Sequence, residues 1–130
     1  MPHLPWIVLP TYDEAENLEA IVAAVLPIMR DAVGRDAFRV LVVDDNSPDG
    51  TGRIADRLAA EEPELEVLHR PLREGLGSAY LAGFRVALDG GATHVFEMDA
   101  DFSHEPHDLP RLLDASADAD LVLGSRYVPG

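Results

Sequence analysis

The chain has 130 residues, of which 47% are hydrophobic, and a formal net charge of −14 at pH 7. This length and apolar content predict a single folded domain over residues 1–130 and exclude a disordered chain. The acidic charge argues against nucleic acid as a partner, because duplex binding needs a basic surface. The absence of cysteine excludes disulfides and thiolate chemistry and is compatible with a cytoplasmic location.

All ten basic residues are arginines, which excludes any mechanism that needs a lysine. The net charge opposes anionic ligands in general, so a phosphate ligand would need a metal ion, an arginine or a helix N-terminus nearby. No apolar run approaches the roughly 20 residues of a membrane span. The first residues lack the basic start and long apolar stretch of a signal peptide.

Short apolar runs alternate along the chain with amphipathic stretches. The apolar runs predict strands that are covered on both faces, at residues 6–9, 38–43, 66–68, 93–98 and 121–123. Apolar residues at helical spacing predict the helices between them, around residues 18–29, 51–62, 76–88 and 103–113. This regular alternation implies an α/β domain with a mainly parallel sheet and helices on both faces.

Three details refine these elements. The stretch Pro10-Thr11-Tyr12 is expected to close the first strand. Pro27 is expected to kink the last turn of the first helix or to end its hydrogen bonding, since proline has no N–H to donate. In the third helix, an apolar face is marked by residues four apart: Leu76, Tyr80, Phe84 and Leu88.

The fourth predicted strand runs directly into two carboxylates, Asp99 and Asp101. Two anions this close repel each other unless a cation lies between them. A divalent cation that holds a phosphate fits, because Mg²⁺ is usually bound by one or two carboxylates and the substrate phosphates. Taken alone, the Asp-Ala-Asp stretch is also compatible with a simple polar turn.

Polar clusters follow four of the predicted strands. In open parallel sheets, ligands bind beyond the carboxyl ends of the strands, near the point where the strand order reverses. Residues at these ends are therefore candidates for one functional site: Pro10, Tyr12 and Glu14 after the first strand, Asp44 and Asp45 after the second, Asp99 and Asp101 after the fourth, and Ser125 and Arg126 after the fifth.

These segments resemble the inverting GT-A glycosyltransferases, and most closely the dolichol-phosphate (polyprenol-phosphate) mannosyltransferases. The resemblance spans residues 7–127 and is carried by an ordered series of motifs: Pro-Thr-Tyr-Asp-Glu at 10–14, Asp-Asp-Asn-Ser-Pro-Asp-Gly-Thr at 44–51, Gly-Leu-Gly-Ser-Ala-Tyr at 75–80, Asp-Ala-Asp at 99–101 and Gly-Ser-Arg-Tyr at 124–127. It implies a Rossmann-like GT-A nucleotide-sugar-binding domain.

The resemblance also implies the reaction. The donor would be GDP-mannose and the acceptor a polyprenyl phosphate, with Mg²⁺ or Mn²⁺ as the cofactor. An acceptor phosphate oxygen would displace GDP at the anomeric carbon with inversion. A phosphate nucleophile is already ionised near neutral pH, so no general base is required.

Residue roles follow from the matching motifs. Pro10, Tyr12 and Glu14 match residues around the nucleoside, and Asp45 matches a carboxylate at the base or ribose. Asp44 either joins them or only braces the turn. Asp99 and Asp101 match the metal and diphosphate site. Ser103 stands where relatives often carry a glutamine near the metal, and a helix cap is an equal alternative. Arg126 matches a phosphate-site arginine and, with Asp101, is the predicted catalytic pair.

The chain departs from the family in two ways. Asp13 replaces the asparagine that is common in the first motif, which adds charge near the donor. Complete relatives also continue beyond the position of Gly130, so the chain is expected to be truncated at its C-terminus, with most of the acceptor site absent. The lipid acceptor implies work at the cytoplasmic face of a membrane, with attachment through the missing segments or a partner.

Three alternatives compete with this interpretation. A related enzyme could use UDP-glucose or another nucleotide sugar on the same fold. The chain could also bind the donor without turnover. A signalling receiver domain has similar size and an acidic pair, but that pair follows its first strand and it needs a lysine after its fifth, which disfavours this class here.

Overall fold

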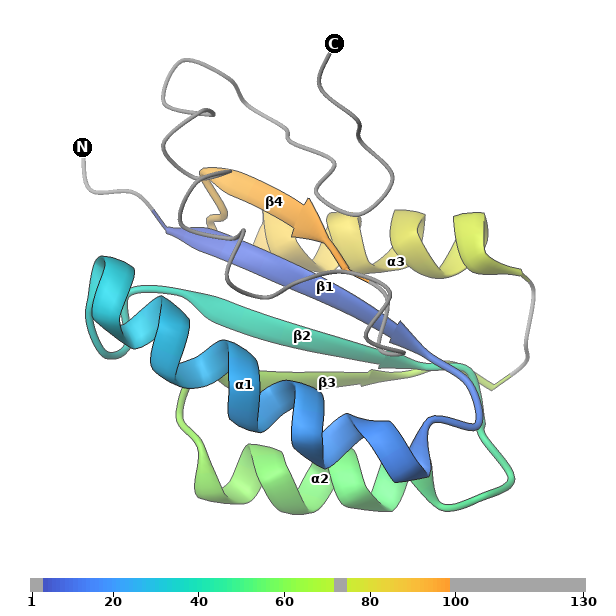
Figure 1. Cartoon of the computed structure of the whole chain (residues 1–130). Helices are drawn as coiled ribbons and strands as arrows, with labels where there is room; N and C mark the ends of the chain where they lie inside the picture. Colours follow the sequence, from blue (N-terminus) through green and yellow to red (C-terminus); the bar gives the residue numbers. More distant parts are fainter. Residues whose placement is uncertain (1–3, 72–74, 99–130) are drawn as a thin grey trace, which may run out of the picture.

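The computed structural model describes residues 4–71 and 75–98, and every prediction for residues 99–130 lies outside this part. Strands and helices alternate along the described chain as the sequence predicts (Figure 1). They are β1 (Pro5–Thr11), α1 (Ala15–Val33), β2 (Arg39–Asp44), α2 (Thr51–Glu61), β3 (Leu65–His69), α3 (Leu76–Asp89) and β4 (His94–Glu97).

The four strands form one parallel sheet in the order β3-β2-β1-β4. The chain builds outward from β1 to β3 and then crosses over to place β4 on the other side of β1. This reversal creates a topological switch point between β1 and β4. Ligands of open α/β sheets bind outside the carboxyl ends of the strands at such a point. The carboxyl ends of β1 and β4 are therefore the expected location of a ligand site.

Helices cover both faces of the sheet, as predicted. α1 and α2 lie on one face and α3 on the other (Figure 1). Successive strand residues point to opposite faces, and the two cores follow this alternation. Ile7 and Leu9 of β1 join the core under α1 and α2, whereas Trp6 and Val8 join the core under α3. Burial on both faces explains why the strands read as continuous apolar runs.

β1 ends at Thr11, within the stretch predicted to close it, and Pro10 lies inside the strand. Val8 accepts a hydrogen bond from the amide of Met98, at 3.0 Å, on the β4 side. Hydrogen-bonding direction alternates along a strand, so the missing N–H of Pro10 lies on that same side. The ladder between β1 and β4 ends at the pair Val8–Glu97, so the proline interrupts none of the ladder bonds in the described residues.

Pro27 does not end the first helix, because α1 continues to Val33. Proline removes one hydrogen bond, the one that would reach the carbonyl of Ala23. Both Pro27 and Ala23 are exposed, so water can satisfy that carbonyl. The helix therefore loses one backbone hydrogen bond on its solvent-exposed face, and the hydrogen bonds of its buried face are unaffected.

The apolar face predicted for α3 does not stay against the sheet over its whole length. Tyr80 is buried, but Leu88 is 64% exposed. A helix turns by about 100° per residue, so each step of four residues advances by about 40°. From Tyr80 to Leu88 this drift reaches about 80°, which turns the later side chain out of the interface.

The amino edge of the sheet carries a buried ion pair. Glu64, just before β3, is fully buried, and Arg30 of α1 donates from Nη2 to Glu64 Oε1 at 2.6 Å and from Nε to Oε2 at 3.2 Å. Arg30 also contacts Glu62 at 2.6 Å, and the amide of Asp36 donates to Glu64 at 2.9 Å. The hydrogen bonds from Arg30 outweigh burial and lower the pKa of Glu64 to about 2.

We predict that Gly83→Ala destabilises the protein by about 1–3 kcal/mol, the usual cost of overpacking a core. A Cβ at Gly83 of α3 would lie 2.5 Å from Val8 Cγ1 and 3.1 Å from Val43 Cγ2. Gly77 in the same helix is the matched control, because its Cβ would meet nothing within 4 Å. Gly77→Ala should be neutral or stabilising by about 0.5 kcal/mol. Equal urea midpoints for the two variants would contradict the close approach of α3 to the sheet.

We also predict that Glu64→Gln lowers the free energy of unfolding by about 2–3 kcal/mol, because it leaves a mostly buried arginine with a weaker partner. The folded pKa of Glu64 lies below its ordinary value of 4.5. Its contribution is therefore complete above about pH 4.5 and is lost as the pH falls toward 2. Urea unfolding from pH 7 to pH 3 should show wild type losing its advantage over the variant. Glu61→Gln, at an exposed position, should stay within about 0.5 kcal/mol of wild type.

Candidate functional site at the carboxyl edge of the sheet

The ends of β1 and β2 bring five predicted nucleotide-sugar-binding residues to one edge: Pro10, Tyr12, Glu14, Asp44 and Asp45. Thr11 pairs with Asp44 in the ladder, and the amide of Asp45 donates to the Thr11 carbonyl at 3.3 Å. The other predicted site residues lie outside the described residues: Asp99, Asp101, Ser103, Ser125 and Arg126. Met98, the last described residue, donates its amide to the Val8 carbonyl of β1 at 3.0 Å.

Asp44 points toward the face of α1 and α2 and is buried. Its Oδ1 accepts hydrogen bonds from Thr11 Oγ1 at 3.1 Å and from Ser47 Oγ at 2.6 Å, and its Oδ2 accepts from the Ser47 amide at 3.3 Å. A Cβ at Gly52 would come within 2.9 Å of Asp44 Oδ2, so only glycine leaves room for this arrangement. These contacts support the turn-bracing role for Asp44, and a nucleotide contact stays a prediction.

Asp45 is the next residue and therefore points to the opposite face, toward α3. Its Oδ1 lies 3.3 Å from Nη1 of Arg70, and the side chains of both residues are almost wholly buried. Arg70 also donates from Nη2 to Ser78 Oγ at 2.7 Å. Arg70 is not among the predicted site residues; its position directly after a strand, one residue past the end of β3, is the signal that could have identified it.

The loops after β1 and β2 are joined by three consecutive backbone N–H groups. Each N–H donates to a side chain of the segment 47–51 at 3.1 Å: Asp13 to Ser47 Oγ, Glu14 to Thr51 Oγ1, and Ala15 to Asp49 Oδ2. We call these bonds the loop lock. The first N–H groups of a helix have no partner within it, and here the neighbouring loop supplies one for Ala15. The lock fixes the backbone that carries Tyr12 and Glu14.

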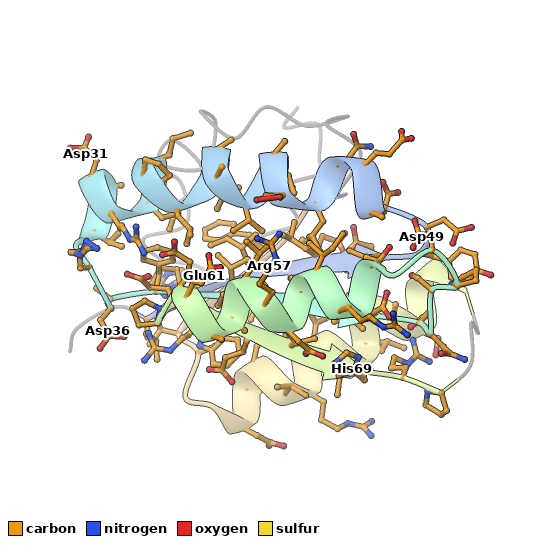
Figure 2. All side chains as sticks on the ribbon, turned by 90° about the horizontal axis from the view of Figure 1, so that it is seen from below. Asp31, Asp36, Asp49, Arg57, Glu61 and His69 are labelled. Atoms are coloured by element: carbon orange, nitrogen blue, oxygen red, sulfur yellow. The ribbon has the colours of Figure 1, made fainter. Side chains whose placement is uncertain are left out.

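Asp49 is the centre of the loop lock. Figure 2 shows it in the loop beside the first turn of α1. Its Oδ1 accepts from both the amide and the hydroxyl of Thr51, while its Oδ2 accepts from Ala15. The hydrogen bond from the Thr51 hydroxyl is the main reason why the pKa of Asp49 lies below its ordinary value. Asp49 therefore accepts hydrogen bonds from the first N–H groups of two helices, at Ala15 of α1 and Thr51 of α2.

The left-handed backbone at two loop positions explains a departure from the family motif. Asp13 has φ 55° and Asn46 has φ 59°. Asparagine and aspartate are the side chains that tolerate this region best apart from glycine. Aspartate can thus replace the usual asparagine at position 13 without altering the turn, and its side chain is exposed.

Helix N-termini offset part of the acidic charge at this edge. In a parallel β-α arrangement the helices begin where the strands end, so α1, α2 and α3 all start here. The positive end of each helix dipole and its unpaired N–H groups favour anions. A nucleotide diphosphate can therefore approach this edge although the chain has a net charge of −14.

A polar cavity of about 430 Å³ lies beside α2. It is lined by residues of the segment from the end of β2 to the first turn of α2, between 44 and 53, together with Asp56 and His69. His69 Nε2 and Asp56 Oδ1 are 2.8 Å apart. Asp44 borders this cavity, whereas Tyr12, Glu14 and Asp45 do not. The two neighbouring aspartates thus face different surroundings, which separates their roles further.

Residues 4–71 and 75–98 contain no group of three or more His, Asp or Glu side chains arranged to hold a metal ion. The predicted metal ligands Asp99, Asp101 and Ser103 follow β4 outside these ranges. In the same described ranges, no helix has the length and apolar character needed to cross a membrane.

Comparison with known proteins places this edge in a family context. The profile of glycosyl transferase family 2 matches residues 6–130. The chain is 54% identical over 123 residues to the undecaprenyl-phosphate mannosyltransferase of Micrococcus luteus, covering 95% of this chain and 48% of that protein. It is 52% identical over 126 residues to the polyprenol monophosphomannose synthase of Mycolicibacterium smegmatis, covering 95% and 45%. It is 38% identical over 125 residues to the dolichol-phosphate mannosyltransferase of Pyrococcus furiosus, covering 95% and 33%.

A solved structure confirms the fold. The mannosyltransferase PcManGT from Pyrobaculum calidifontis, in complex with GDP-Man and Mn²⁺, matches with a TM-score of 0.74 and 29% identity over 88% of this chain and 32% of that one. The chain thus has the predicted GT-A type of α/β fold. It spans half or less of the length of the curated relatives it matches.

We predict that Asp49→Ala destabilises the protein by about 1–2 kcal/mol, the range found for loss of a helix-capping side chain. The variant removes one bond of the loop lock and the acceptor of the Thr51 hydroxyl. Because the folded pKa of Asp49 is lowered, its contribution is present above its ordinary value of 3.8 and is lost as the pH falls below it. Thermal unfolding at pH 7 provides the measurement. Asp31→Ala, at the far end of α1 (Figure 2), is the control and should change stability by less than about 0.5 kcal/mol; equal losses for both would contradict the lock.

Proposed function

The chain belongs to glycosyl transferase family 2, and we propose that it is the donor-binding part of a polyprenyl-phosphate mannosyltransferase. The observation that carries this proposal is the identity of 54% and 52% with two bacterial enzymes of this kind over 95% of the chain. Substrate choice is a property of the site rather than of the fold.

The proposed donor is GDP-mannose, bound across the carboxyl edge of the sheet. A structural neighbour of this chain holds GDP-Man and Mn²⁺. In the proposed arrangement, Pro10, Tyr12 and Glu14 surround the nucleoside and Asp45 contacts the base or ribose. The loop lock supports this assignment, because it fixes the segment from Asp13 to Ala15 before any ligand arrives. Preorganisation of this kind lowers the entropic cost of binding.

Asp99, Asp101 and Ser103 are the proposed ligands of Mg²⁺ or Mn²⁺. When bound, such an ion would offset the negative charge that develops on the leaving diphosphate. Arg126 is proposed to contact the same phosphates, where the planar guanidinium allows two parallel hydrogen bonds. The described edge contributes helix N-termini to this charge balance.

The proposed reaction is a single displacement. A phosphate oxygen of the polyprenyl phosphate attacks the anomeric carbon of mannose, and the bond from that carbon to the diphosphate oxygen of GDP breaks. The configuration at the carbon inverts, and GDP leaves with its bonding electron pair. No base has to accept a proton, because the acceptor phosphate is already ionised near neutral pH.

The lipid acceptor places the proposed reaction at the cytoplasmic face of a membrane. The described residues hold no helix that could span the bilayer. Peripheral contact with the bilayer, through further segments or through a partner, would bring the donor site to the lipid phosphate.

We predict that Asp101→Ala abolishes the Mn²⁺-dependent part of GDP-mannose binding, measured by isothermal titration with and without the metal. The loss should be at least roughly ten-fold in Kd, the equivalent of about 1.4 kcal/mol. Asp56→Ala is the control, because it removes an equal charge from an exposed position on α2.

A donor panel extends this test. UDP-glucose should compete poorly with GDP-mannose, and a preference for it would replace the donor assignment. Unchanged Mn²⁺-dependent binding in Asp101→Ala would disprove the metal site. Mannose transfer to a polyprenyl phosphate, compared between this chain and one extended at its C-terminus, would show whether this part suffices for turnover.

A further inference from the structure

We propose that Arg70 is a positioning residue of the donor site, which orients the Asp45 carboxylate and links it to the first turns of α3. The inference rests on the proposed function, because Asp45 is the proposed contact to the nucleoside. It adds a residue that the family motifs at the strand ends do not include.

The sheet itself places Arg70 beside Asp45. The last pair in the ladder between β2 and β3 is Asp44–His69, and the amide of Arg70 donates to the Asp44 carbonyl at 2.8 Å. The side chain of His69 contacts Asp56 on the α2 side. One residue further on, the alternation of the strands turns both Asp45 and Arg70 to the α3 side. Their meeting is therefore fixed by backbone register.

The pair of Arg70 and Asp45 is almost wholly buried, so leaving either charge without the other would be costly. The side chains of Arg70 and Asp45 are 10% and 6% exposed. A carboxylate this far from water is costly without a positive partner, since its hydration is lost. Arg70 thus supplies the positive partner that this buried carboxylate needs and constrains its orientation. A neutral residue at position 70 would not supply this charge.

The second arm of the guanidinium reaches α3. Nη1 lies 3.3 Å from Asp45 Oδ1, and Nη2 donates to Ser78 Oγ at 2.7 Å. A guanidinium can hold two partners in a fixed plane, whereas a lysine ammonium is a point charge without this fork. Ser78 belongs to the Gly-Leu-Gly-Ser-Ala-Tyr motif at 75–80. Arg70 therefore connects the proposed nucleoside contact with the first turn of α3, where this motif lies.

The test is GDP binding in the presence of Mn²⁺, measured by isothermal titration for wild type, Arg70→Lys, Arg70→Met, Ser78→Ala, Asp45→Asn and the double variant Asp45→Asn/Arg70→Met. Arg70→Met should raise the Kd roughly ten-fold, as expected for loss of a charge-assisted contact. Arg70→Lys should recover only part of this loss, and Ser78→Ala should have a smaller effect. The double variant should bind no worse than Asp45→Asn alone, because Arg70 acts through Asp45.

Arg57 supplies the matched control. It also lies near two carboxylates, Glu19 at 3.1 Å and Glu61 at 3.9 Å, but on the exposed surface of α1 and α2 (Figure 2). Arg57→Lys and Arg57→Met should leave the Kd within two-fold of wild type. If Arg70→Met does not fold, Arg70→Lys and Ser78→Ala decide the question.

The outcomes separate the two proposals. A lower melting temperature of the Arg70 variants with an unchanged Kd would mean a purely structural role and would overturn the inference. Additive losses in the double variant would show that Arg70 acts independently of Asp45 and would overturn it as well. If wild type binds GDP and the Arg70 variants bind equally well, only the inference fails. If wild type does not bind GDP at all, the proposed function fails and the inference falls with it.

Discussion

The two-residue alternation at the end of β2 is the constraint on which the rest of the site depends. It sends the neighbouring carboxylates Asp44 and Asp45 to opposite faces of the sheet. Asp44 accepts hydrogen bonds from the hydroxyls of Thr11 and Ser47 and braces the turn. Asp45 meets Arg70 on the α3 side. A single dipeptide thus combines a structural anchor with a candidate ligand contact, and a one-residue shift of register would exchange the two roles.

Much of the fold could be predicted from the sequence because both signals are local. Continuous apolar runs marked the strands, and helical spacing marked the helices between them. The local rules are overridden where strand pairing, solvent exposure or the drift of a helix face decides the outcome. Proline usually disfavours a strand, yet Pro10 lies inside β1, because its missing donor faces a side where the described ladder has already ended. Pro27 does not end α1, because the lost bond is on the exposed face. Leu88 leaves the interface through the drift of a four-residue repeat.

The candidate site likewise has a part that could be predicted from the sequence and a part that could not. The strand ends could be predicted because alternation of strands and helices puts them on one edge. The loop lock could not, since the bonds of Asp49 and Thr51 to the other loop depend on how far apart β1 and β2 lie and on their register. The pairing of Arg70 with Asp45 depends likewise on the register between β2 and β3. Residue types identified candidates, whereas pairwise partners required the sheet.

The position of β1 at the switch point also has a consequence for the order in which the sheet can form. Contacts between β1 and β2 close a stretch of 32 residues, whereas contacts at the β1–β4 edge close 89. Closing the longer loop costs about 0.9 kcal/mol more chain entropy. Pairings that are distant in sequence also tend to be slow. Among the four described strands, the pairing of β4 with β1 beside the candidate site is therefore the one that a chain emerging from the ribosome is expected to complete last.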